Sequence, residues 1–161
     1  MSRRLLIIGL GNPDRGDDGV GALVVEALTG RQPSDVEMML RTGDMLALVE
    51  DWAGANTVIC IDAAAAVGSP GRIHRVDGYA DALLPEPGLA SSHAFGLAEA
   101  IALSRALGTA PPTLVVYAIE GRVFDTGAPV SPEVAGAVEA ATSQILTEVR
   151  RLRATAEVAH A

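Results

Sequence analysis

The sequence predicts an α/β protein in which a mostly parallel β-sheet carries helices on both faces. Strand-like and helix-like patterns alternate along the chain, and several of the strand-like runs are apolar throughout. Such alternation is typical of parallel sheets with crossover helices, and continuous apolar runs are typical of strands covered on both faces. The length of 161 residues fits one domain, which we expect to span residues 1–161.

Each expected strand has its own signal in the sequence. The first is a short apolar run that ends in glycine, and the third is the most β-rich run of the chain. The fourth alternates apolar with polar residues, which is typical of a strand near a sheet edge. The expected strands are 4–10, 36–40, 57–61, 72–76 and 114–119.

The expected helices show apolar residues at helical spacing and recognisable ends. Ser91, Ser92 and Gly108 are candidate caps of the third helix, whereas Pro132 and Glu133 suit the first turn of the last. The expected helices are 18–28, 45–52, 94–107 and 131–150, and residues 154–161 are expected to fray. The irregular stretch 78–92 leads directly into a histidine, and loops of this length are often functional.

The composition excludes several classes of function. The net charge is −8, and all 12 basic residues are arginine. A chain this acidic is a poor binder of nucleic acid or anionic membrane, and an aromatic content of 3% leaves little for base stacking. The single cysteine, Cys60, cannot form an internal disulfide. We expect no nucleic-acid partner and no membrane association.

The N-terminal run is better interpreted as a buried strand than as a signal peptide. It follows two arginines, but it is short and ends at Gly11-Asn12-Pro13-Asp14, where acids would occupy the cleavage region. No stretch approaches the ~18 uninterrupted apolar residues of a transmembrane helix. The expected location is the cytoplasm.

Polar residues gather where the expected strands end, which is where ligands bind in open α/β sheets. The first of these segments begins like a dinucleotide-binding loop, but the third glycine of that motif is replaced by Asp14, whose carboxylate would repel a pyrophosphate. No Gly-Lys-Ser/Thr follows, so we expect no organic cofactor. The four segments are residues 9–19, 62–66, 91–93 and 120–121.

Asp18, Asp62 and His93 are the candidate site residues. A histidine at a helix N-terminus tends to stay neutral, and neutral imidazole is the form that binds metal. Two carboxylates and one imidazole would form a mixed oxygen–nitrogen site that suits nickel or zinc. Capping for Asp18 and Asp62, and a surface position for His93, are the plainer interpretations that stay open.

The other candidate residues favour structural roles. Capping is expected for Asp17 and Asp44, a core position for Cys60, and surface positions for His74 and His160. Glu120, beyond a strand end, is a candidate for supporting the site.

In combination, several motifs resemble those of the hydrogenase maturation proteases. Gly9-Leu10-Gly11-Asn12 is followed six residues later by Asp18, and Ile59-Cys60-Ile61-Asp62-Ala63 resembles the family's strand that ends in an aspartate. Ser92-His93, with Gly96-Leu97 after it, resembles its histidine helix. Runs 116–120 and 130–134 resemble its closing strand and helix, so the resemblance covers about residues 4–150.

The resemblance implies a three-layer αβα sandwich around a twisted, mostly parallel five-stranded sheet, a phosphorylase/hydrolase-like fold. It also implies an endopeptidase that removes a C-terminal extension from the large-subunit precursor of a nickel–iron hydrogenase after nickel insertion. The metal-contacting positions of the family fall on Asp18, Asp62 and His93, which makes them the implied catalytic and metal-binding residues. The nickel would belong to the substrate, and we expect a monomer.

One segment departs from the family pattern. Many members carry an Asp-Gly-Gly-Thr-like turn after the second strand, whereas this chain has Thr42-Gly43-Asp44, so that only the glycine clearly carries over. Whether Asp44 takes over any role of the family's acid stays open.

Two alternative functions stay open. Gly9-Leu10-Gly11-Asn12-Pro13 is also similar to the first loop of peptidyl-tRNA hydrolases, but the Thr-Arg-His-Asn-type segment of that family is absent and the net charge opposes tRNA binding. A nickel-sensing adaptor or metallochaperone would use the same three ligands without cleavage.

Overall fold

A central sheet separates two pairs of helices. The computed structural model describes residues 4–80 and 92–158, of which 92–95, 156 and 157 are described by their backbone alone. The strands are β1 (Leu5–Leu10), β2 (Val36–Arg41), β3 (Thr57–Ala65), β4 (Ile73–Asp77) and β5 (Thr113–Gly121). The helices are α1 (Val20–Leu28), α2 (Leu48–Asp51), α3 (Ser92–Leu107) and α4 (Pro132–Val158). Two 3₁₀ turns, η1 (Gly16–Gly19) and η2 (Met45–Ala47), precede α1 and α2.

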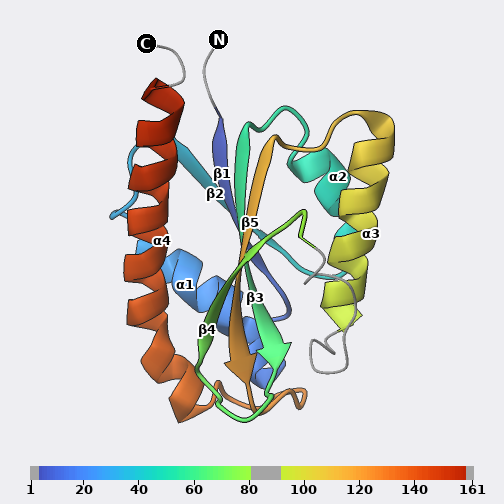
Figure 1. The fold of residues 1–161 in the computed structure, drawn as a ribbon. Helices are drawn as coiled ribbons and strands as arrows, with labels where there is room; N and C mark the ends of the chain where they lie inside the picture. The colour runs from blue at the N-terminus through green and yellow to red at the C-terminus, as the bar shows by residue number, and fades with distance from the viewer. Residues whose placement is uncertain (1–3, 81–91, 159–161) are drawn as a thin grey trace.

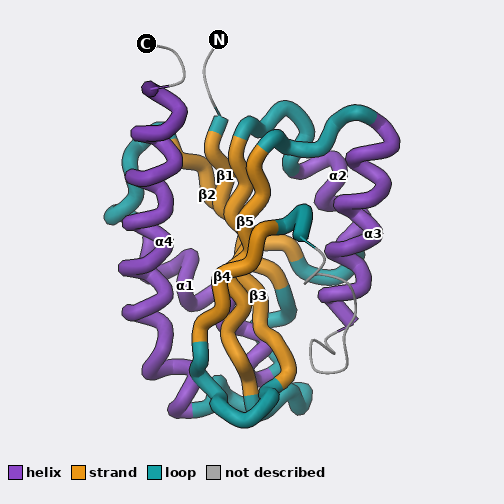
Figure 2. Tube along the Cα trace, in the orientation of Figure 1, coloured by secondary structure: helices purple, strands orange, loops and turns teal. Residues whose placement is uncertain are grey.

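The sheet has the order β2-β1-β3-β5-β4. All neighbouring strands are parallel except β4, which runs antiparallel to β5 at the edge. Helices α1 and α4 cover one face, and α2 and α3 cover the other (Figures 1 and 2). The predicted αβα sandwich and the predicted edge position of the fourth strand are therefore confirmed.

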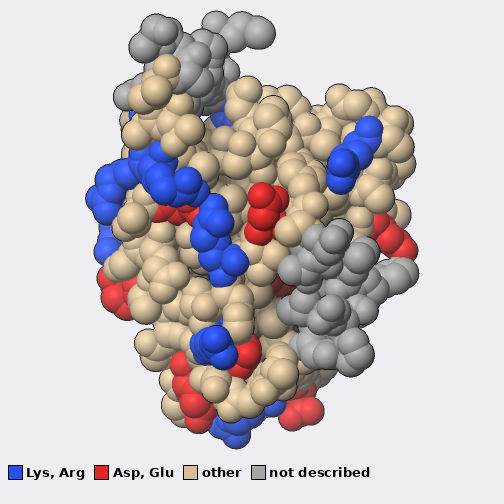
Figure 3. Space-filling model, in the orientation of Figure 1, with Lys and Arg blue, Asp and Glu red and all other residues tan. Residues whose placement is uncertain are grey.

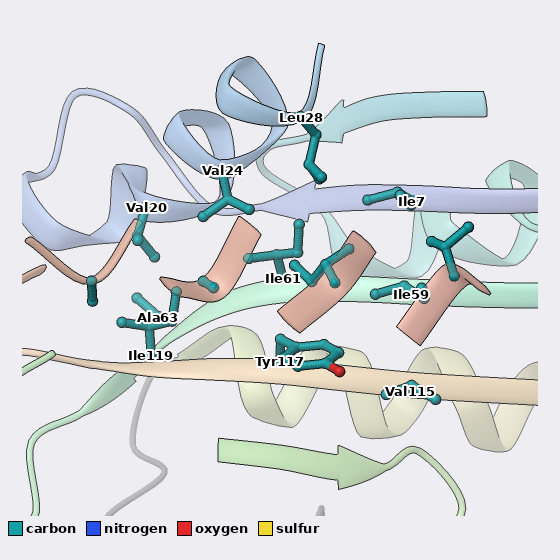
Figure 4. Packing of buried hydrophobic residues seen from close by; sticks show 14 of the residues in the cluster. Ile7, Val20, Val24, Leu28, Ile59, Ile61, Ala63, Val115, Tyr117 and Ile119 are labelled. Carbon is teal, nitrogen blue, oxygen red and sulfur yellow. The ribbon is translucent and has the colours of Figure 1, made fainter. Parts of the chain in front are cut away.

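Each face of the sheet has its own apolar core. Alternating residues of the buried strands point to opposite faces, so Ile59 and Ile61 pack beneath α1 and α4, whereas Val58 and Cys60 pack towards α2 and α3. Figure 4 shows the first cluster, where Tyr117 of β5 lies beside Ile61 of β3 and Ile119 lies beside Ala63. Because Asp62 follows Ile61 in the same strand, alternation assigns it to the face that carries α3.

Three expected boundaries are wrong. The strand predicted to stop at Ile61 continues to Ala65, and the one predicted to stop at Ile119 continues to Gly121, so both Asp62 and Glu120 lie inside strands. Alanine and glycine weakened the apolar signal at both ends. The last helix continues to Val158, beyond the predicted frayed start at residue 154, because its alanines and charged residues favour helix.

No helix in the described part of the chain has the length and apolar character needed to cross a membrane. On the face drawn in Figure 3, basic side chains lie chiefly over the α4 side of the molecule, with acidic side chains among and below them.

Candidate functional site

The first loop is held tightly against the ends of β1 and β3. Gly9 and Gly21 let α1 approach these strands closely, because a Cβ at Gly21 would lie 2.7 Å from the carbonyl oxygen of Leu10 and 2.9 Å from that of Ile61. Gly11 has a φ of +109° and leaves no room for a Cβ, which would lie 2.3 Å from the Asp18 carbonyl oxygen. The glycines of this motif therefore place Asp18 at the carboxyl edge of the sheet.

Asp18 and Asp62 are both buried at this edge. Only 2% of Asp18 and 4% of Asp62 is exposed. The Asp18 carboxylate accepts a hydrogen bond of 2.9 Å from the Asn12 N–H, and Arg15 lies 4.0 Å from it. The Asp62 carboxylate accepts a bond of 2.8 Å from the Ala63 N–H.

The two carboxylates interact electrostatically. Burial raises the pKa of Asp62 to about 8, the bond from Ala63 opposes this rise, and the negative charge of Asp18 adds to it. A buried carboxylate next to a like charge is stabilised either by a proton or by a cation. The charge of Asp18 therefore acts on Asp62, and the convergence of Asp18, Asp62 and His93 on one metal stays a prediction. Capping by Asp62 of a following segment is wrong, because β3 continues past it.

His93 lies in the first turn of α3, the helix that covers the same sheet face as Asp62, as the sequence predicted. Its side chain is outside the described residues, so its place as the third ligand stays a prediction. The predicted functional loop 78–92 also falls largely outside them, since residues 81–91 are not described. Among the described side chains alone, no three of His, Cys, Asp or Glu come together as a metal site.

Asp17 differs sharply from its neighbour Asp18. It is fully buried and accepts four hydrogen bonds, from the backbone N–H groups of Arg122, Val123 and Ser131 and from the Ser131 hydroxyl. Burial alone would raise the pKa of Asp17, but these bonds outweigh it and hold the pKa below its ordinary value. Asp17 makes no capping hydrogen bond within η1 or α1, so the predicted capping role is wrong.

Glu120 and His74 form a pair that the sequence did not predict. Glu120 is buried, accepts a 3.0 Å bond from the Ser69 N–H, and lies 3.0 Å from Nε2 of His74. These bonds lower the pKa of Glu120, the one with His74 most strongly. The partly exposed His74 agrees with its expected surface position, while His160 lies outside the described residues.

The remaining predicted roles are structural. Asp44 caps η2 by accepting a 2.9 Å bond from the Leu46 N–H, which confirms the capping interpretation. Cys60 is buried, and burial, with the charge of Asp62 adding to it, raises the pKa of its thiol. In the turn that departs from the family pattern, the acidic residue Asp44 therefore serves as the N-cap of η2.

The fold and the paired carboxylates define an αβα protein with an acidic site at the carboxyl edge of its parallel strands. The HycI family model, described as hydrogenase maturation protease, matches residues 24–148. This range is more than half of the chain, and it includes Asp62 and His93 but begins after Asp18. The chain belongs to the hydrogenase maturation protease family and is a peptidase.

Individual relatives agree with this assignment. The chain is 28% identical over 151 residues to the hydrogenase 2 maturation protease of Escherichia coli K12, with 91% of each chain covered. It is similar in structure to the hydrogenase maturating endopeptidase HybD of E. coli, with a TM-score of 0.80, 24% identity, and coverage of 92% of this chain and 93% of that one. It is also similar to a hydrogenase 2 maturation peptidase of Thaumarchaeota archaeon SCGC_AB-539-E09, with a TM-score of 0.67, 26% identity, and coverage of 91% and 98%.

Proposed function

We propose that this peptidase removes the C-terminal extension of a nickel–iron hydrogenase large-subunit precursor after nickel has been inserted. The proposal rests most on one observation: Asp18 of η1 and Asp62 of β3 are both buried, and the charge of Asp18 raises the pKa of Asp62. In a family named for hydrogenase maturation, a carboxylate pair at the carboxyl edge supports recognition of a metal that the substrate carries.

The donor set fits that cargo. Two carboxylate oxygens and an imidazole nitrogen suit a borderline divalent cation such as nickel, and a cation would relieve the repulsion between the buried carboxylates. We propose that Asp18 and Asp62 position the precursor's nickel and a water, with His93 as third ligand. Hydrolysis then adds that water across the scissile C–N bond, giving a new C-terminal carboxylate and a released extension.

The decisive experiment compares the nickel-loaded precursor with the nickel-free precursor. Incubation with the wild-type chain should shorten the nickel-loaded precursor at its C-terminus, as measured by intact mass, and leave the nickel-free precursor whole. Stable binding without a mass change would instead support a non-catalytic adaptor and overturn the proposal.

The site residues are tested with matched variants. Asp18→Asn, Asp62→Asn and His93→Ala should leave the precursor uncut while each variant still unfolds cooperatively. Asp14→Asn removes an exposed carboxylate from the same loop as Asp18 and should process normally, as should His74→Ala. Full processing by the His93→Ala variant would refute the assignment of the third ligand.

The proposal extends to the state and place of the protein. We propose that a monomer acts on the precursor in the cytoplasm. Light scattering after size exclusion checks the first point, and cell fractionation checks the second.

A further inference from the structure

Two adjacent aspartates at the site have different surroundings. The charge of Asp18 acts on Asp62, whereas the Asp17 carboxylate is directed to the segment between β5 and α4, about a hundred residues further along the chain. One Asp17 oxygen, Oδ2, accepts bonds of 2.6 Å from the Arg122 N–H, 2.9 Å from the Val123 N–H and 2.9 Å from the Ser131 hydroxyl. The other, Oδ1, accepts 2.7 Å from the Ser131 N–H.

Backbone hydrogen bonds join the same two loops. The Asp17 N–H donates to the Val123 carbonyl at 2.7 Å, and the Gly16 N–H donates to the Ala128 carbonyl at 3.1 Å. In the opposite direction, the Gly127 N–H donates to the Asp14 carbonyl at 2.6 Å. Both side-chain and backbone groups of the first loop are therefore fixed by residues 122–131.

These contacts restrain Asp18 from one side, and Gly11 and Asn12 restrain it from the other. A Cβ at Gly121 would lie 2.9 Å from the Asp17 Cβ, so the end of β5 also packs directly against Asp17. Asp18 follows within the same 3₁₀ turn, and its carboxylate is held by the Asn12 N–H. A displacement of Asp17 would therefore move Asp18 relative to Asp62.

We propose that Asp17 is a positioning residue, which fixes the Asp18 carboxylate for metal recognition by bonding the first loop to the β5–α4 segment. This inference rests on the proposed function. Groups that orient a metal ligand without touching the metal change metal affinity or activity by ~10- to 100-fold when they are removed. A misplacement of ~1 Å at a reacting centre has effects of similar size.

The test uses Asp17→Asn, with Glu148→Gln as its matched control. The asparagine has nearly the same shape, but its NH₂ group would face at least one N–H donor, so a bond is lost. Glu148 is likewise a buried carboxylate with several partners, namely Arg75, Arg151 and Tyr117, and it lies on α4. Both variants lose a buried charge, but only one loses it next to Asp18.

The readout is the ratio between the affinity for the nickel-loaded precursor and the affinity for the nickel-free precursor, measured on folded protein at times shorter than cleavage. We expect Asp17→Asn to reduce this ratio ~10- to 100-fold and Glu148→Gln to leave it within about threefold of wild type. Cleavage of the nickel-loaded precursor should fall in parallel. An unchanged ratio in Asp17→Asn would show that its role is purely structural and would overturn the inference.

A milder pair of variants covers the case in which Asp17→Asn does not fold. Ser131→Ala removes only the hydroxyl donor, whereas Ser131→Thr keeps it at the same position. We expect Ser131→Ala to lower the ratio of affinities for the nickel-loaded and nickel-free precursors by less than Asp17→Asn does. Ser131→Thr should restore the wild-type ratio. Equal, wild-type ratios in both would count against the inference. Failure of the proposed function is recognised separately, because the wild-type chain would then neither cleave the precursor nor distinguish its two forms.

Discussion

Replacing Gly11 with alanine tests whether the first loop is packed as tightly as the structure indicates. The new Cβ would lie 2.3 Å from the Asp18 carbonyl oxygen and 2.9 Å from its Oδ1, below the 3.0 Å that such contacts respect. The two backbones would have to separate by at least about 0.7 Å. In addition, a φ of +109° is unfavourable for any residue with a side chain.

The expected loss in the free energy of unfolding of Gly11→Ala has two parts. The backbone conformation costs ~1–3 kcal/mol and the overpacking a further ~1–3 kcal/mol, so the free energy of unfolding should fall by ~4 kcal/mol. Gly54→Ala is the matched control, since Gly54 has a φ of +81° and no atom within 4 Å of its added Cβ. That variant should lose only the conformational part, ~1–3 kcal/mol.

Urea unfolding measures both losses, and an unchanged m-value shows that the same surface is exposed in each variant. Because Asp18 must move, Gly11→Ala should also process the nickel-loaded precursor at least ~10-fold more slowly, while Gly54→Ala should process it normally. Equal losses of stability in the two variants would refute the tight packing of Gly11 against Asp18.

Three further predictions follow from the buried ionisable groups. In Asp17 and Glu148, burial raises the pKa, but hydrogen bonds lower it more. The stability that these ionised carboxylates give the fold is therefore present above the ordinary carboxyl pKa and is lost as the pH falls through their pKa in the folded protein. At pH values below about 4 the melting temperature should therefore decrease, and it should decrease less steeply in Glu148→Gln. The pKa of Asp62 is raised to about 8, so ionising it costs stability as the pH rises towards that value; Asp62→Asn should melt higher than wild type at pH 8, with the difference shrinking towards pH 4, and equal melting at pH 8 would contradict this. Burial and a thiol pKa above the ordinary value should protect Cys60 from a thiol reagent in the native protein at pH 8, whereas the urea-unfolded chain should react at once; rapid native labelling would show that β3 opens locally.

The sequence predicted the layers of the fold because burial leaves a strong pattern. The apolar run before Asp62 is continuous, and a strand covered by helices on both faces needs such a run. The same signal failed at the strand ends, where Ala63 and Gly121 are neither strongly apolar nor good strand formers. Because both strands continue past their expected ends, the backbones of Asp62 and Glu120 are fixed by the pairing of β3 with β5 and not by loops.

The position of Asp18 was predicted better than the role of Asp17. The spacing of glycines before Asp18 reflects a close backbone approach, which is a local property that a sequence shows. The four donors to Asp17 come from residues 122–131, and nothing in the sequence links these two segments. An acid before a helix is more often a cap, so the sequence favoured the wrong role. The pairing of His74 with Glu120 could not be predicted either, because it depends on the register of β4 against β5, which the sequence does not show.

The different surroundings of Asp17 and Asp62 have a physical consequence for how the site works. Asp17 is buried, but four donors keep it charged, so it can serve as a fixed anchor over a wide pH range. The pKa of Asp62 is raised by burial and by Asp18, so its charge is costly without a compensating cation. A cation that approaches this edge therefore meets one carboxylate whose loop is already anchored and another whose ionisation it would favour. Under the proposed function, such an arrangement would make the binding of a metal-loaded substrate more favourable than that of a metal-free one, and it would give a reason why nickel insertion precedes cleavage.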